Sequence, residues 1–342
     1  MALLCLTAWR LYLAPTPPRL VRVTGKVMGT TYTVKVVART REQQSDAARS
    51  ALAQRVKGAL DAVNTSMSTY RPDSELSRFN ALAAGEKATL SAAMVDVMTV
   101  AERVHHWSNG AFDTTVGPLV DRWGFGANQP SRALPTPDEL AELRQALGHD
   151  QLVFDPEAGT LEKKRAELRV DLSAIAKGYG VDRVAGVLRA GGWTDFMVEV
   201  GGEIRVAGQT EAGRSWRLAV ERPTEAGRAI QEVVALDSDQ AMATSGDYRN
   251  FTVVDGVRYS HTIDPTTGRP VTHALASVSV VADTCVEADA MATALAVLGP
   301  DRGYTLAAAH NMAALFLVGS SGDLEVRATD PWVKLRVPFP QR

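Results

Sequence analysis

The sequence is poor in cysteine and has no excess of positive charge, and both shortages exclude classes of protein. Its two cysteines, Cys5 and Cys285, are far apart, and neither has a partner at the spacing of a metal motif. Zinc ribbons, iron–sulfur sites and disulfide scaffolds are therefore excluded. Lysine and arginine number 37 against 39 aspartates and glutamates, so the net charge is −2. We expect no nucleic-acid partner, because such a partner needs a clustered basic surface.

Common nucleotide and hydrolase motifs and a long apolar run are also missing. The chain has no G-x-x-x-x-G-K-[ST] loop, no G-x-G-x-x-G after a predicted strand, no H-E-x-x-H and no G-x-S-x-G. Residues 1–14 are apolar but are interrupted by Arg10, whereas a transmembrane helix needs about 20 apolar residues. We expect residues 1–20 to be either a leader without a function of its own or the remnant of an export signal or anchor.

The composition is that of a globular chain with a large core. Of its 342 residues, 45% are hydrophobic and 22% are charged. We expect one domain over residues 21–342, with a possible internal seam in the proline-rich loop near 126–137.

Hydrophobic periodicity predicts helices and strands in consecutive groups. Three helix starts carry capping signals: Ser91, Thr136 with Glu139, and Thr284 with Glu287. Ser173 is expected to cap a fourth helix. Helices are predicted over 43–64, 91–107, 137–148, 173–190, 285–298 and 301–309, and strands over 21–37, 151–154, 160–170, 194–206, 216–221, 232–236, 250–262 and 274–282. Because strands do not alternate strictly with helices, the pattern favours an α+β fold with largely antiparallel sheets and flanking helices.

One predicted helix carries a candidate half-site for a cation. Asp289 and Thr293 are four residues apart, so their oxygens lie on one face of the helix that follows Thr284. Mg²⁺ prefers a few protein oxygens together with substrate phosphates. The alternative is an ordinary solvated aspartate and a threonine that bonds back to its own helix.

Several other polar side chains have both a functional and a structural interpretation. His261 follows a predicted strand beside hydroxyls and a carboxylate, so it is either a general base or a hydrogen-bonded surface group. Lys177 is either a phosphate ligand or one member of a solvated pair. The rings of Tyr70 and Phe112 either stack on an aromatic ligand or belong to the core. We interpret the tandem His105-His106 as structural, because imidazolium suits a helix C-terminus.

Six segments in register resemble the FAD:protein FMN transferase family (the ApbE family) over about Val27 to Thr293. They are Met28-Gly29-Thr30-Thr31-Tyr32, Phe112-Asp113, Asp171-Leu172-Ser173-Ala174-Ile175-Ala176-Lys177-Gly178, Gly201-Gly202, His261-Thr262-Ile263-Asp264-Pro265-x-x-Gly268 and Ala288-Asp289-Ala290-Met291-Ala292-Thr293. The resemblance implies a T-fold-like α+β architecture. It also implies Mg²⁺-dependent cleavage of FAD, with FMN transferred through a phosphoester to a threonine or serine of an acceptor flavoprotein and AMP released.

The resemblance also implies roles for individual residues. The FAD-contacting positions are Met28, Tyr70, Ala111, Phe112, Asp113, Asp171, Lys177 and Ile263. The Mg²⁺ site consists of Ala174, through its backbone carbonyl, with Asp289 and Thr293. His261 is the expected catalytic base, which accepts the proton of the incoming hydroxyl.

The resemblance further implies a location and partners. We expect a periplasmic protein, associated with the inner membrane, that acts on flavoprotein subunits of membrane respiratory complexes. The lipid-anchoring cysteine common in the family has no convincing equivalent here. Two alternatives to the transferase are a Mg²⁺-dependent FAD pyrophosphatase, which uses water as the acceptor, and a non-catalytic FAD-binding protein, which needs no metal.

Overall fold

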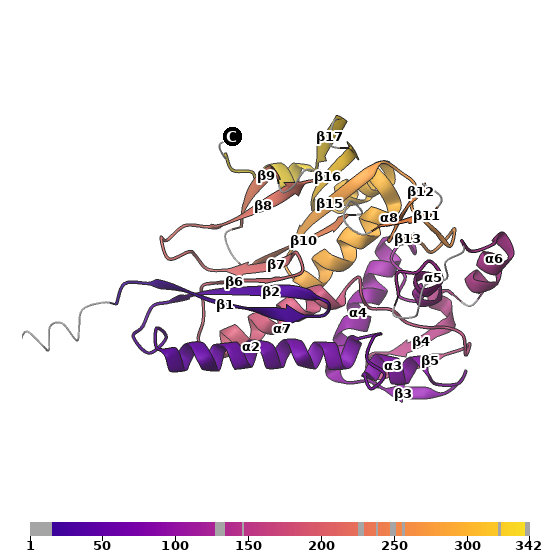
Figure 1. Cartoon of the computed structure of the whole chain (residues 1–342), viewed down its shortest axis with the longest axis horizontal. Helices are drawn as coiled ribbons and strands as arrows, with labels where there is room; N and C mark the ends of the chain where they lie inside the picture. The colour runs from indigo at the N-terminus through magenta and orange to yellow at the C-terminus, as the bar shows by residue number, and fades with distance from the viewer. Residues whose placement is uncertain are drawn as a thin grey trace, which may run out of the picture.

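An eight-stranded sheet organises the chain. The computed structural model describes residues 16–126, 134–145, 147–224, 229–236, 239–246, 251–254, 257–320 and 323–338. Every pairing in the sheet is antiparallel, which confirms the predicted fold class (Figure 1). Its strand order is β1 (Arg19–Val27), β2 (Thr30–Ala38), β6 (Phe196–Val200), β7 (Glu203–Ala207), β10 (Gln240–Gly246), β15 (Leu275–Ala282), β16 (Ala313–Ser320) and β17 (Asp323–Ala328).

Each face of this sheet carries a core cluster, because neighbouring side chains of a strand point to opposite faces and other elements cover both faces. On one face, Val34 and Val36 of β2 pack in a cluster with α2 (Asp46–Met67), α7 (Ala176–Ala190) and the start of α8 (Cys285–Ala309). On the other face, Val37 packs in a cluster with the hairpin of β8 (Trp216–Arg222) and β9 (Ala229–Leu236) and with α9 (Asp330–Val333).

The remaining elements surround the helical face. A third core cluster joins α8 to α4 (Ala92–Trp107) and to the small sheet β3-β5-β4. The bounds of these elements are α3 (Glu75–Asn80), β3 (Lys87–Thr89), α5 (Gly117–Arg122), α6 (Pro137–Gln145), η1 (His149–Gln151), β4 (Leu152–Asp155), β5 (Thr160–Lys163), β11 (Phe251–Val254), β12 (Val257–Ser260), β13 (Ile263–Asp264) and β14 (Arg269–Pro270).

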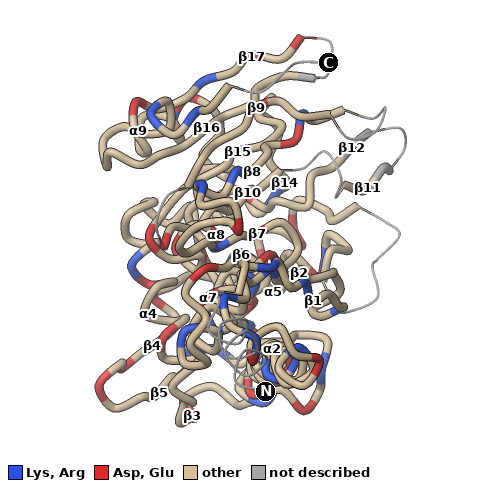
Figure 2. The backbone as a smooth tube through the Cα atoms, turned by 90° about the vertical axis from the view of Figure 1, so that its left-hand side faces the viewer, with Lys and Arg blue, Asp and Glu red and all other residues tan. Residues whose placement is uncertain are grey.

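Charges of both signs are interspersed along the described backbone (Figure 2). No helix within the described ranges has the length and apolar character to cross a bilayer. Most of the expected leader (residues 1–15) and of the proline-rich loop (residues 127–133) lies outside the described residues. Strand β1 begins at Arg19, two residues before the expected start of the domain at residue 21.

Two of the predicted helix caps are confirmed. The Ser91 side chain accepts a hydrogen bond from Met94 N at 3.3 Å. Thr136 and Glu139 form the reciprocal pair of a capping box, with bonds of 3.2 and 2.7 Å. The cap expected from Ser173 does not form, because α7 begins at Ala176 and the Ser173 hydroxyl instead donates to Asp171 Oδ1 at 2.6 Å.

The start of α8 corrects another expectation. The Thr284 hydroxyl donates to Glu287 Oε2 at 2.8 Å and caps no backbone N–H group. Instead, the half-buried carboxylate of Asp182 on α7 accepts from Cys285 N at 3.0 Å and from Val286 N at 2.9 Å, and it also pairs with Arg205. The predicted break between two helices is confirmed, because Gly299 adopts φ 78° immediately before Pro300.

We predict that Asp182→Ala destabilises the protein much more than Thr284→Ala does. The first change removes the cap of α8 and one charged partner of the mostly buried Arg205, so we expect a loss of about 3 kcal/mol in the free energy of unfolding. The second removes a hydroxyl that caps nothing and should cost less than about 0.5 kcal/mol. Urea unfolding of both variants measures the difference, and equal losses would contradict the role of Asp182.

Candidate active site

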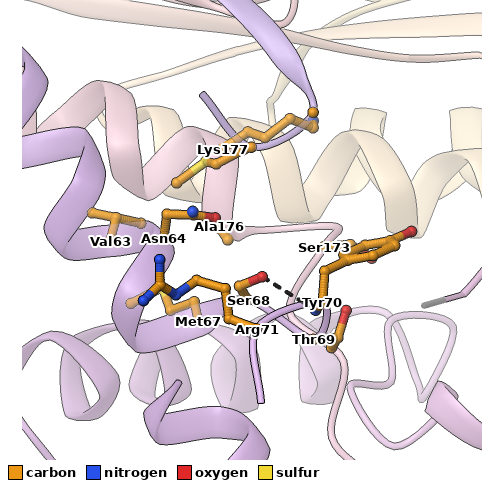
Figure 3. Close-up of a pocket in the computed structure, with 12 residues that line it drawn as sticks. Val63, Asn64, Met67, Ser68, Thr69, Tyr70, Arg71, Ser173, Ala176 and Lys177 are labelled. Carbon is orange, nitrogen blue, oxygen red and sulfur yellow. Dashed lines mark hydrogen bonds between the residues drawn. The ribbon is translucent and has the colours of Figure 1, made fainter. Parts of the chain in front are cut away.

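A cavity of about 480 Å³ lies between the end of α2 and the start of α7. Figure 3 shows the segment Ser68–Arg71 on one side of it and Lys177 on the other. Its lining residues are Met28, Gly29, Val63, Asn64, Met67, Ser68, Thr69, Tyr70, Arg71, Ser173, Ala176 and Lys177. Three predicted FAD-contacting residues, Met28, Tyr70 and Lys177, thus share one cavity although they are far apart in the sequence.

Met28 occupies the tight turn between β1 and β2. Its φ is 48°, a left-handed conformation that is uncommon for a residue with a side chain, and Gly29 follows with φ 70°. The thioether of Met28 lies against Gly180 of α7, where a Cβ atom would be 3.5 Å from the Met28 methyl group. The turn therefore presents an apolar, polarisable side chain to the cavity.

Tyr70 is a large aromatic residue that stays exposed at the cavity edge. It is 69% accessible, and in Figure 3 its ring extends toward Ser173. Partial burial of the hydroxyl, together with the negative charge of Asp171, raises the pKa of Tyr70. The exposed ring is thus available to stack on a planar ligand.

The segment 111–114 contacts Asp171 through a backbone hydrogen bond. Asp171 N donates to Thr114 O at 2.7 Å, and Asp113 and Asp171 each accept a backbone N–H group and a hydroxyl from the residue two positions on. Ala111 and Phe112 are buried, and the Phe112 ring belongs to the core cluster around α4. The core interpretation of Phe112 is therefore correct for its ring.

Lys177 stands at the centre of a buried charge cluster. Its Nζ atom lies 2.7 Å from Glu203 Oε1 and 3.6 Å from Asp289 Oδ1. The three side chains come from α7, β7 and α8. Both carboxylates are almost fully buried, with Glu203 3% and Asp289 4% exposed.

One ammonium group faces two carboxylates in this cluster. The pKa values of Glu203 and Lys177 are both shifted by burial and by these neighbouring charges. Burial raises the pKa of Glu203 to about 7; Lys177 opposes this effect and Asp289 adds to it. Burial alone would lower the pKa of Lys177, but Asp289 and Glu203 together outweigh burial and raise it. The cluster holds more negative than positive charge when both carboxylates are ionised.

Of the predicted metal-site residues, Asp289 lies at the contact between α7 and α8. Asp289 is buried rather than solvated, and its Oδ2 atom accepts from Gly178 N at 2.9 Å. Thr293 lies half-buried one turn further along α8, and Ala174 lies just before the start of α7. Asp289 is therefore held by α7 itself, in contrast to the solvated alternative.

His261 and Ile263 lie beside α5. Ile263 is buried in a cluster with Leu119 and Trp123. His261 is half-buried, and its ring meets that of Phe125 edge-on at 6.4 Å between centroids.

Sequence reasoning missed two residues of this site. Glu203 ends the Gly201-Gly202-Glu203 segment, and Arg71 directly follows Tyr70, so both lie next to positions that were identified. Among the described residues, Glu203 Oε2 and Arg71 Nε are buried atoms without a hydrogen-bond partner. Such atoms are costly unless a ligand or solvent satisfies them.

Comparison with known proteins gives consistent results. The profile of the ApbE family matches residues 28–316. The chain is 44% identical to a FAD:protein FMN transferase of Vibrio cholerae over 88% of each chain, and 39% identical to one of Haemophilus influenzae over 93% of this chain and 92% of that one. A solved structure of the flavin transferase ApbE from Vibrio cholerae superposes with a TM-score of 0.85 at 41% identity, covering 93% of this chain and all of that one.

The close approach of α7 to α8 yields a prediction with an internal control. A Cβ atom at Gly178 would lie 2.3 Å from Cys285 O and 2.8 Å from Asp289 Cβ, whereas one at Gly186 on the same helix would meet nothing within 4 Å. Gly178→Ala should therefore cost about 1–3 kcal/mol of stability. Gly186→Ala should be neutral or stabilising by up to about 1 kcal/mol. Similar urea midpoints for the two variants would contradict this helix contact.

Proposed function

Because this chain belongs to the ApbE family and is a FAD:protein FMN transferase, we propose that its reaction depends on Mg²⁺ and releases AMP. The acceptor is the hydroxyl of a threonine or serine in a partner flavoprotein. The hydroxyl oxygen forms a bond to the phosphorus of the FMN half, and the pyrophosphate bond to the AMP half breaks. The observation that carries the proposal is the buried cluster of Lys177, Glu203 and Asp289 beside the cavity.

The charge of this cluster fits a divalent cation. Lys177 balances only one of the two carboxylates, and Glu203 Oε2 is buried without a partner in the described chain. Asp289, the Thr293 hydroxyl and the Ala174 carbonyl would hold the ion with the hard oxygen ligands that Mg²⁺ prefers. Bound there, Mg²⁺ would neutralise negative charge on the pyrophosphate, which is the main requirement of this chemistry.

The cavity fits a large, flat and anionic ligand. Tyr70 offers an exposed ring, Met28 an apolar contact and Arg71 a buried Nε donor without a partner in the described chain. These residues would bind and orient FAD. Asp113 and Asp171 would contribute through the loops that their own carboxylates hold in place.

We assign the proton transfer to His261. An alcohol is far too weak an acid to ionise at neutral pH, so a positioned base must take its proton as the new bond to phosphorus forms. His261 is half-buried against Phe125, in the segment that leads into β13. We further propose that the protein acts in the periplasm, at the inner membrane, on flavoprotein subunits of respiratory complexes.

One incubation tests this function against its two alternatives. The chain is mixed with FAD and a candidate acceptor, with Mg²⁺ or with a chelator, and the products are analysed by mass spectrometry. We expect an acceptor heavier by one FMN, together with AMP, only when Mg²⁺ is present. Free FMN without a modified acceptor would indicate a pyrophosphatase, and intact FAD would indicate a binding protein.

We predict that Asp289→Ala lowers Mg²⁺-dependent transfer at least about tenfold while FAD binding changes much less. The reason is that Asp289 supplies the only carboxylate of the proposed metal site. Glu287→Ala is the matched control, because this carboxylate on the same helix pairs with Arg103 and Thr284 instead. Transfer and calorimetric FAD binding are measured at several Mg²⁺ concentrations. Full Mg²⁺-dependent transfer by the Asp289 variant would refute the metal site.

We predict that His261→Ala lowers transfer by about 10²–10⁴-fold and leaves FAD affinity nearly unchanged, because the imidazole moves a proton rather than holding FAD. Wild-type transfer should rise with pH as the imidazole loses its proton, because only the neutral ring can accept one. The exposed His310 provides the control, His310→Ala. A folded His261 variant with normal transfer would refute the base, and its melting temperature checks the fold.

A further inference from the structure

Three of the six histidines gather at the C-terminal end of α4, next to the segment 112–115. His105 and His106 end this helix, and His149 begins η1. The rings of His105 and His149 stack at 4.2 Å between centroids, with an angle of 21° between their planes. His149 Nε2 lies 3.7 Å from Glu102 Oε1.

Glu102, His106 and His149 direct ligand atoms to one point. One carboxylate oxygen and one ring nitrogen from each histidine all lie within 4.8 Å of one another. Glu102 and His106 are four residues apart, so they share a face of α4. His149 approaches them from a separate segment of the chain. Three ligands from two segments thus form a site that a single ion can occupy.

A hydrogen bond of His106 fixes the tautomer that a metal ligand requires. His106 Nδ1 lies 2.8 Å from Glu102 O, and a carbonyl oxygen can only accept, so Nδ1 carries the proton. Nε2 of the neutral His106 ring therefore keeps its lone pair. A proton on one ring nitrogen, donated to a carbonyl, is the usual support of a histidine that binds metal through the other.

The surroundings of His149 also favour the neutral ring. Burial lowers the pKa of His149, and the nearby His105 lowers it further, although Asp113 and Glu102 oppose this shift.

We propose that Glu102, His106 and His149 bind one divalent transition-metal ion, with Zn²⁺ as the reference. Imidazole nitrogen suits Zn²⁺, whereas Mg²⁺ prefers oxygen ligands throughout. Two histidines and one carboxylate leave a fourth position for water in a tetrahedral site. This ion is therefore distinct in chemistry from the Mg²⁺ proposed at Asp289.

The site is connected to the flavin side of the molecule by hydrogen bonds. The ring of His105 stacks on that of His149, and its Nδ1 atom lies 2.8 Å from Phe112 O. Gly148 N donates to Thr115 Oγ1 at 2.9 Å, and Thr115 Oγ1 donates to Asp113 Oδ1 at 2.7 Å. An ion that fixes His149 on α4 would thereby fix the segment 112–115 as well. Its role is to position this segment rather than to take part in the reaction.

Metal titration of the full chain without a polyhistidine tag tests the site. Mg²⁺ is kept saturating, so that the proposed Mg²⁺ site does not contribute, and Zn²⁺ binding is measured by calorimetry. Co²⁺ absorption reports four-coordinate geometry. We expect one Zn²⁺ per chain and a higher melting temperature on binding. His106→Ala, His149→Ala and Glu102→Gln should each weaken Zn²⁺ binding at least about tenfold.

Two controls separate this site from adventitious binding. His310→Ala removes an exposed histidine outside the cluster and should leave Zn²⁺ affinity unchanged. Asp289→Ala should also leave it unchanged, which distinguishes the site from the proposed Mg²⁺ site. His106 is exposed, so its variant should fold, and its melting temperature without metal checks this. Equal Zn²⁺ affinity in wild type and His106→Ala, or no binding by wild type, would overturn the proposal.

Discussion

The contact of one ammonium group with two buried carboxylates constrains the architecture around it. Lys177, Glu203 and Asp289 come from α7, β7 and α8, so their meeting fixes two helices and a sheet strand relative to one another. Isolated charges are expensive to bury, and such a cluster persists only where the fold holds it together. The cation site proposed above uses the same cluster, in which two carboxylates face one ammonium group.

A second polar connection lies one turn along the same helix. Gly178 N holds Asp289, and Asp182, four residues later on α7, holds the first N–H groups of α8. Both contacts lie on one face of α7, and the missing side chain of Gly178 lets the two backbones approach. The start of α8 is therefore defined by another helix rather than by its own sequence. The packing of α7 against α8 therefore determines where Asp289 lies.

Local signals in the sequence predicted much of the fold and part of the site. Ser91 and Thr136 cap their helices as expected because capping depends on neighbours in sequence, and the spacing of Asp289 and Thr293 correctly placed them on one helix. Thr284 failed as a cap because a distant carboxylate took its place. The small side chains of β10 and the whole of β16 gave no recognised strand signal. Glu203 was missed because its importance arises from burial, which only tertiary structure creates. Arg71 was missed because only tertiary structure buries its Nε atom.

The left-handed turn at Met28 has a consequence for how the cavity is maintained. A non-glycine residue at φ 48° carries backbone strain of order 1 kcal/mol, which glycine would relieve. Glycine would, however, delete the thioether that fills the space between the cavity and Gly180. Local stability and the shape of the cavity therefore place opposite demands on this single position. Selection for heat resistance alone would favour glycine at position 28. That substitution would remove the side chain that lines the apolar edge of the cavity.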